Sequence, residues 1–258
     1  MVPRRVLRIL LLSCLTGLSA LPAAVAQSPT PGPTYPIMQG TMPPGMAGHW
    51  AAMLRGRPAC FQPVRVILPE GGKVTWFNGS PHDVLTLDAP AQAAILLGPV
   101  YRLRISHMPS HPGVELYPTV ELLDRLHPPA GREHEYPVPV TFTEQEIEYA
   151  LQGRLVTKVV YLEQPNIAAP EAAAFGVTTP PALIPASEDP LHVADLRGRP
   201  MMIVRLGGRL PAVNEHPSFY GSGAPVLAPG AHPPPEQPVL EGVPHGAVPT
   251  RSPLFTEE

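Results

Sequence analysis

Proline is the residue that most limits how this chain can fold, because it occupies 39 of the 258 positions. Its ring fixes one backbone angle and its nitrogen carries no proton, so it interrupts helix interiors and central strands. Proline and alanine are dense from 168 to 190, and proline and glycine are dense after residue 207. We therefore expect one folded domain over residues 61–207, with a linker at 168–190 inside it.

The two ends of the chain read differently from this domain. Residues 27–60 are rich in proline, methionine and glycine, and residues 208–258 are again rich in proline and glycine. Neither stretch shows the apolar periodicity that a packed helix or strand requires. Both are predicted to be disordered, as a leader and a tail.

The first 26 residues have the pattern of a cleaved export signal. Arginines near the start precede an apolar run from Ile9 to Leu21, and Ala24-Val25-Ala26 fits a cleavage site. The apolar run is too short for a spanning helix, so we expect no transmembrane span after cleavage at Gln27. The sequence thus predicts an exported protein with a periplasmic, cell-envelope or extracellular location.

Cysteine usage agrees with a domain that depends on its apolar core. The chain has two cysteines, and cleavage would remove Cys14, which leaves Cys60 without a partner for an internal disulfide. An alternative interpretation takes Leu11-Leu12-Ser13-Cys14 as a lipoprotein site, with a lipid on Cys14. The net charge of −3 predicts neither nucleic acid nor an anionic membrane surface as a partner.

Alternating apolar and polar side chains predict β-strands. The clearest run is Val100–Ser106, where Arg102 and Arg104 face away from the apolar side chains. Val114–Leu122 alternates around Pro118, which predicts a bulge or an edge strand there. Leu155–Leu162 is apolar on both faces, which is typical of a central strand.

One helix has its own boundary signals. Thr143 and Glu146 form a capping box, and Phe142 with Ile147 fits a hydrophobic staple. Ile147, Ala150 and Leu151 would form the buried stripe, and Gly153 would end the helix. A second, shorter helix is expected at Leu191–Leu196.

Further strands complete the fold class. They are expected at Gln62–Leu68, Lys73–Phe77, His82–Leu87 and Met201–Leu206, with Glu70 to Lys73 as a hairpin turn. About seven short strands with close turns favour an immunoglobulin-like antiparallel β-sandwich with one short connector helix. A partly open β-barrel is the alternative.

Three runs carry a resemblance to a known family. They are GVELYPTVELLDRLHPPAGRE, then YPVPVTFTEQEIEYALQGRLVTKVVYLEQP, and later ADLRGRPMMIVRLGGRLP. Over roughly Phe61 to Pro211 the chain resembles a family of uncharacterised exported proteins common in planctomycete-type bacteria. The resemblance implies an envelope or secreted location and no particular activity.

Searches for chemistry give weak signals. Walker, nucleophile-elbow and zinc-protease motifs are absent from the sequence. His107 and His111 are four residues apart, a spacing that would let both bind zinc from one face of a helix. The prolines between and after them exclude a helix there. Glu115, Glu121 and Asp124 are interpreted as a solvated outer face.

The sharpest pattern lies in the leader, where Met38, Met42, Met46, His49 and Met53 recur every three or four residues. Thioethers with an imidazole select Cu(I). Chance spacing in a low-complexity segment is the competing interpretation.

The sequence therefore predicts an exported, non-catalytic cell-envelope module, interacting or structural, whose partner is an envelope protein or a cell-wall component. One alternative is a periplasmic Cu(I)-binding protein that uses the leader. Another is a hydrolase without a recognisable motif.

Overall fold

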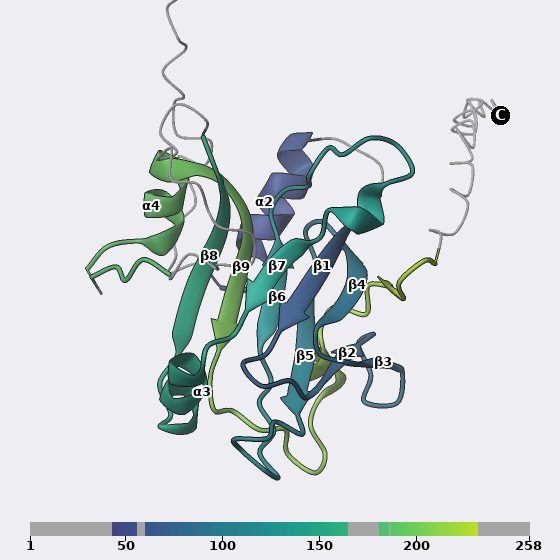
Figure 1. Cartoon of the computed structure of the whole chain (residues 1–258), viewed down its shortest axis with the longest axis vertical. Helices are drawn as coiled ribbons and strands as arrows, with labels where there is room; N and C mark the ends of the chain where they lie inside the picture. Colours follow the sequence, from purple (N-terminus) through teal and green to yellow (C-terminus); the bar gives the residue numbers. More distant parts are fainter. Residues whose placement is uncertain (1–42, 56–59, 165–180, 186, 232–258) are drawn as a thin grey trace, which may run out of the picture. The chain divides into compact units, whose positions relative to one another are not determined.

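Two separate β-sheets form the framework of the described chain (Figure 1). The computed structural model describes residues 43–55, 60–164, 181–185 and 187–231, which all belong to one compact unit, Tyr35–Glu258. Within these residues a four-stranded sheet has the order β10-β4-β1-β7, and a six-stranded sheet has the order β3-β2-β5-β6-β9-β8. The predicted mostly-β sandwich is confirmed.

The strands are β1 (Phe61–Ile67), β2 (Lys73–Phe77), β3 (Val84–Asp88), β4 (Ala91–Leu96), β5 (Val100–Ser106), β6 (Thr119–Leu122), β7 (Val138–Thr141), β8 (Val156–Glu163), β9 (Gly198–Leu206) and β10 (Val226–Leu227). The helices are α2 (Met46–Arg55), α3 (Glu144–Leu151) and α4 (Pro190–Arg197), with short 3-10 turns η1 (Glu133–Glu135) and η2 (Pro217–Tyr220).

The connection from β1 to β2 differs from the prediction. The residues between Ile67 and Lys73 carry the chain from one sheet to the other, so they are not a hairpin turn. β1 instead pairs with β4 antiparallel and with β7 parallel, with Val64 opposite Val138. The four-stranded sheet is therefore mixed, which a purely antiparallel prediction did not include.

Pro118 lies directly before an inner strand and not on an edge. β6 sits between β5 and β9, and the register is the same on both sides of Pro118, so the expected bulge or edge strand is wrong. The ladder tolerates this proline because its carbonyl oxygen still accepts a hydrogen bond from the Leu103 nitrogen at 2.9 Å. An isolated bridge between Ile105 and Leu116 extends the pairing beyond it.

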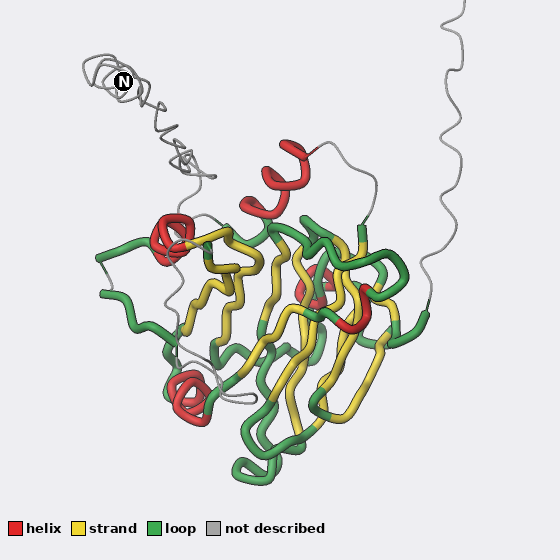
Figure 2. Tube along the Cα trace, turned by 45° about the horizontal axis from the view of Figure 1, so that its top comes forward, coloured by secondary structure: helices red, strands yellow, loops and turns green. Residues whose placement is uncertain are grey.

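Strand β8 lies at the edge of the six-stranded sheet, so its predicted central place is also wrong. Its apolar character on both faces has a different cause. On one side Val156 and Val160 pack against the main core, and on the other Val159 packs against a smaller cluster that contains Leu191 of α4. Figure 2 shows α3 and α4 near opposite ends of the β8–β9 pair.

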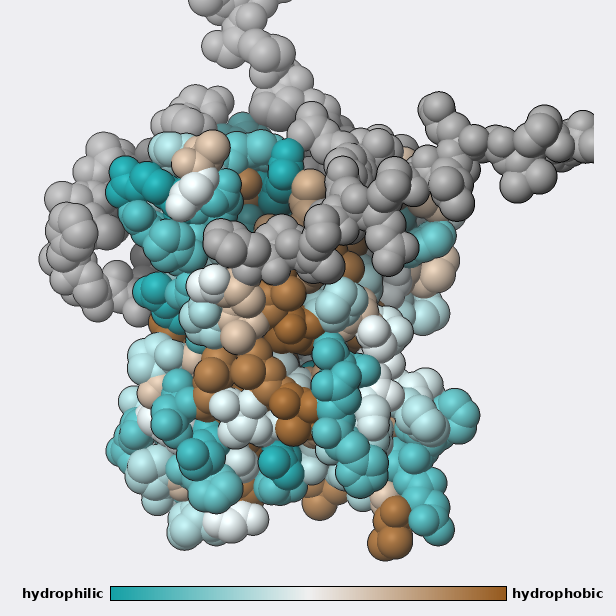
Figure 3. Space-filling model, turned by 90° about the vertical axis from the view of Figure 1, so that its right-hand side faces the viewer, coloured by the Kyte–Doolittle hydropathy of each residue, from teal (hydrophilic) through white to brown (hydrophobic). Residues whose placement is uncertain are grey.

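The inner faces of the two sheets form the main core. Val64 and Val66 of β1 and Leu103 and Ile105 of β5 are fully buried, as their alternation predicts, and Trp76 fills the space between. Apolar side chains also gather in the middle of the face shown in Figure 3, bordered by hydrophilic ones. Across the described residues no helix is both long and apolar enough to cross a membrane.

Helix α3 confirms the predicted start but corrects the predicted stripe. The Thr143 side chain accepts from the Glu146 nitrogen, and the Glu146 carboxylate accepts from the Thr143 nitrogen. Ile147 and Ala150 are buried, whereas Leu151 is 44% exposed. An aspartate at 151 is therefore expected to be tolerated, contrary to the stripe that the sequence indicated.

Two segments predicted to be disordered contain regular structure. Residues 46–55 of the leader form α2, and residues 217–220 and 226–227 of the tail form η2 and β10. Both predictions are wrong for these residues, because each segment gains contacts with the sandwich that its own composition does not reveal. The export signal, most of the linker and residues 232–258 lie outside the described residues.

Candidate functional site

Helix α2 packs on the outer face of the six-stranded sheet, at the end of β6. The Gly48 nitrogen donates to Glu121 Oε1 at 2.6 Å. A side chain at Gly48 would meet the Gly98 carbonyl oxygen at 2.5 Å, so only glycine allows this close approach to the β4–β5 turn. The helix is thereby fixed against residues about fifty to seventy positions further along the chain.

Glu121 lies beneath the helix and is fully buried. Its other carboxylate oxygen accepts from Arg205 Nη1 at 3.0 Å, and the Arg205 side chain is 11% exposed. Burial of both charges is tolerable because each has a partner of opposite sign. The interpretation of Glu121 as part of a solvated face is wrong, because that interpretation did not foresee α2.

Asp124 is likewise fully buried, and not solvated as predicted. Its carboxylate lies 3.3 Å from Arg199 Nε and also accepts from the Arg125 nitrogen at 2.7 Å. Glu115 remains partly exposed, with Arg104 at 3.2 Å and the Tyr117 hydroxyl at 2.8 Å.

The histidines of the considered zinc site do not converge. His111 Nε2 lies 2.5 Å from Glu144 Oε1, and His107 Nδ1 lies 3.0 Å from the Ser106 hydroxyl. His127 and His134 are exposed. Within the described ranges no three histidine, cysteine or acidic residues form a metal-binding group.

The methionine pattern of the leader is partly described. Met38 and Met42 lie outside the described residues. Met46, His49 and Met53 stand on α2 at positions i, i+3 and i+7, which is one face of a helix. All three are exposed, with Met46 at 40% and Met53 at 60%.

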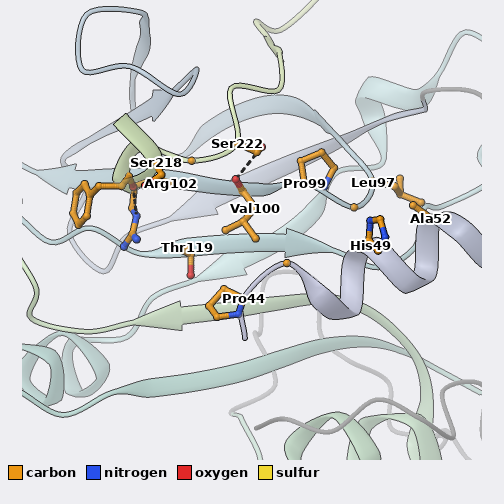
Figure 4. Close-up of a pocket in the computed structure, with 14 residues that line it drawn as sticks. Pro44, His49, Ala52, Leu97, Pro99, Val100, Arg102, Thr119, Ser218 and Ser222 are labelled. Atoms are coloured by element: carbon orange, nitrogen blue, oxygen red, sulfur yellow. Dashed lines mark hydrogen bonds between the residues drawn. The ribbon is translucent and has the colours of Figure 1, made fainter. Parts of the chain in front are cut away.

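A groove of about 610 Å³ runs along this outer face (Figure 4). One wall is the start of α2, another is the β4–β5 turn with Pro99 and Val100, and a third is η2 with the residues after it. The lining is mainly apolar, with hydroxyl groups from Thr119, Ser218 and Ser222, the imidazole of His49 and the guanidinium of Arg102. Ordinary binding clefts have this volume and this mixture of apolar walls with few polar groups.

The wall at η2 is tied to the sandwich by Tyr101. Its hydroxyl donates to the Pro225 carbonyl at 3.2 Å and accepts from the Leu96 nitrogen at 3.0 Å. The side chain is 1% exposed, and burial raises its pKa to about 12. Ser222 adds a second tie, because its nitrogen donates to the Val100 carbonyl at 3.2 Å.

Arg102 is the charged residue at one end of the groove. Its Nε donates to the Phe219 carbonyl at 2.9 Å and its Nη1 donates to the Tyr117 carbonyl at 2.8 Å. The guanidinium also stacks 4.3 Å from the Phe219 ring centre. Burial lowers the pKa of Arg102, and the nearby charge of Arg209 lowers it further while Glu215 opposes this.

Sequence reasoning located Arg102 on the polar side of its strand but did not identify it as a site residue. The groove is assembled from three segments that are far apart in the chain, and Arg102 and Phe219 are 117 positions apart. The alternation along the strand predicts on which face of the sheet Arg102 lies. It does not predict that the segment around Phe219 covers that face.

Comparisons with known proteins give no relatives for this chain. No family model, no curated protein and no solved structure matches it.

Proposed function

We propose that this chain is an exported, non-catalytic module of the cell envelope, and that it holds its partner in the groove beside α2. The observation that carries the proposal is the groove itself, whose walls come from α2, the β4–β5 turn and η2. Each wall is anchored in the sandwich by hydrogen bonds from Gly48, Tyr101 or Ser222. A pre-formed cleft loses little entropy when a ligand binds, which suits a recognition module.

The resemblance to exported planctomycete-type proteins and the signal-like first 26 residues support the location. N-terminal sequencing of exported material should begin at Gln27. A diacylglycerol-modified Cys14 would instead make the protein a lipoprotein, and full-length cytoplasmic protein would contradict export.

The binding role is tested by filling the groove. Ser222 is exposed at its edge, so Ser222→Trp should occlude it without disturbing the core. Ser187→Trp places the same side chain on an exposed position outside the groove. Immobilised full-length protein should recover a specific envelope partner as wild type and as the control, and lose it as Ser222→Trp. An identical set of recovered proteins for all three would contradict the proposal.

A second candidate function is Cu(I) binding on α2. It is favoured by the single helical face that carries Met46, His49 and Met53, because thioethers and an imidazole are suitable Cu(I) ligands. Titration of the full chain with Cu(I) against a chromophoric competitor tests it. His49→Ala should weaken binding, whereas His192→Ala, an exposed histidine on α4, should not. Equal affinity in all three proteins would remove the metal hypothesis.

A further inference from the structure

We propose that the groove binds an acidic peptide segment, with a ligand carboxylate on the Arg102 guanidinium and a neighbouring apolar side chain against Pro99 and Val100. This inference rests on the proposed function, because it names the chemistry of the partner that the groove would hold. It follows from the charge of Arg102, from the lining, and from the position of the nearest aromatic ring.

The first argument is that Arg102 makes no ion pair or hydrogen bond with a carboxylate, although the charge of Glu215 acts on it from beyond contact distance. Its two hydrogen-bond acceptors are carbonyl oxygens of Phe219 and Tyr117. A guanidinium has five N–H donors, so three remain after these two bonds, including both on Nη2. Among the described residues none of the ion pairs involves Arg102.

A ligand carboxylate could accept from these remaining donors and would be attracted by the half-buried guanidinium charge. Arg209 is the second guanidinium near this position, at 4.9 Å from the Phe219 ring centre. Its own carboxylate partner is Glu215 at 3.1 Å, with the Arg209 side chain 68% exposed. Glu215 is thus in direct contact with Arg209, and the remaining N–H donors of Arg102 make no carboxylate contact and favour an anionic ligand.

The second argument concerns the rest of the ligand. Beyond Arg102 the lining is mostly short apolar groups such as Pro44, Ala52 and Leu97. Its polar groups are the hydroxyls of Ser218, Ser222 and Thr119 and the imidazole of His49. Apolar walls receive an apolar side chain, and hydroxyls can bond to the amide groups of a peptide backbone. A peptide with leucine, proline or a similar residue next to glutamate or aspartate satisfies both surfaces.

The third argument separates a peptide from an acidic polysaccharide. Sugar recognition commonly uses an exposed aromatic face, and Phe219 is the aromatic residue that lines this groove. Phe219 is only 4% exposed, and its ring already contacts the guanidinium groups of Arg102 and Arg209. Phe219 thus offers a sugar ring no free face, and the exposed ring in the lining is the smaller imidazole of His49, so a peptide fits the groove better.

Selection from a displayed library of random heptapeptides against the full chain tests the proposal. Selected peptides should be enriched in aspartate or glutamate beside apolar residues. Arg102→Gln should weaken their binding about 10- to 100-fold, as expected when a charged hydrogen-bond partner is lost. Arg104→Gln removes an arginine from the same strand that is already paired with Glu115, and it should leave the affinity unchanged.

A reciprocal change keeps the test valid if Arg102→Gln fails to fold. Replacing the ligand glutamate by glutamine should produce the same loss on wild-type protein. Peptides without acidic enrichment, or equal binding by Arg102→Gln, would overturn the inference. So would the recovery of no binding peptide, or Arg102-dependent binding of polygalacturonate in place of peptides.

The outcome also separates this inference from the proposed function. If Ser222→Trp abolishes binding of an envelope partner while Arg102→Gln does not, the groove is the binding site and the acidic chemistry is wrong. If neither substitution affects that partner, the proposed function itself fails.

Discussion

Arg205 and Arg102 lie on the same outer face of one sheet but have opposite surroundings. Thr119 stands between them, opposite Arg205 on β9 and opposite Arg102 on β5. Arg205 is almost buried and paired with the fully buried Glu121 under α2. Arg102, in the neighbouring groove, contacts carbonyl oxygens and an aromatic ring but no carboxylate.

This difference distinguishes a structural charge from a charge available to a ligand. Breaking a compensated buried pair damages the fold, because the remaining charge and the helix N–H lose their partner. Removing a charge that makes no carboxylate contact should affect binding more than folding. Each prediction below tests one side of that contrast.

The largest effect is expected for Glu121→Ala. It leaves Arg205 buried without an anion and removes the acceptor of the Gly48 nitrogen. We expect a loss of about 3–5 kcal/mol in the free energy of unfolding, measured by urea denaturation. Arg102→Ala is the matched comparison and should cost about 2 kcal/mol through its lost bonds to two carbonyls. Equal losses would contradict the distinction between the two arginines.

The second-largest effect is expected at alkaline pH, which should lower the free energy of unfolding through Tyr101. The pKa of Tyr101 is about 12 when folded and 10.0 ordinarily, so the unfolded chain releases this proton first. The stabilising contribution is complete below pH 10 and disappears as pH rises toward 12, for a loss of about 2–3 kcal/mol. Urea midpoints measured from pH 9 to 12 check this.

The matched variant for that experiment is Tyr101→Phe. It should be less stable at pH 9, because two hydrogen bonds are lost, and should show a shallower decline above pH 10. The pKa of Tyr117 is also raised to about 12, so part of the decline should remain. If stability declined with pH in Tyr101→Phe as steeply as in wild type, the titrating group would not be Tyr101.

Gly48→Ala should have an intermediate effect. It changes α2, the helix that covers the Glu121–Arg205 pair and also forms one wall of the groove. Its new methyl group would clash with the Gly98 carbonyl, which is backbone and cannot rotate away. We expect a loss of about 1–3 kcal/mol and weaker ligand binding, because α2 must shift. Gly207→Ala is the control, since its methyl group would meet Leu155 at an ordinary 3.5 Å. Thermal unfolding that is equal for both variants would mean that α2 docks less closely than described.

The smallest stability effect is expected for Arg102→Gln. Glutamine can keep one donor toward the neighbouring carbonyls, so the cost should be at most about 1 kcal/mol. A larger loss, comparable to that of Glu121→Ala, would make Arg102 a structural residue. Urea denaturation beside the Glu121 variant measures this directly.

Strands that bury one face and expose the other could be predicted from the sequence, because every second residue in them is apolar and buried. Val64 and Val66 of β1 and Leu103 of β5 follow this rule. β4 was missed because Ala91 and Ala93 give a weak apolar signal, although both are buried. β7 was missed because Pro139 interrupts a strand of only four residues, where it occupies an exposed position.

The site itself depended on segments whose own patterns did not predict packing against the sandwich. α2 is a short helix in a proline- and glycine-containing leader, and it is held by the bond from Gly48 to Glu121, which is 73 positions later. The tail supplies η2 and β10, whose places are fixed by contacts with Arg102, Tyr101 and β4. Local propensity does not record such long-range contacts, so the groove could not be predicted from the sequence.

The central claim is that Arg102, and not Arg205, is the cation open to a ligand. Both side chains can be followed by nuclear magnetic resonance of arginine Nε–H groups in the full chain during titration with N-acetyl-Pro-Leu-Glu amide. The Arg102 signal should be visible because its Nε–H is held by the Phe219 carbonyl. We predict a saturable shift of the Arg102 signal, an unchanged Arg205 signal, and no shift with the glutamine peptide. An Arg102 signal that stays fixed, or that moves equally with both peptides, would contradict the account.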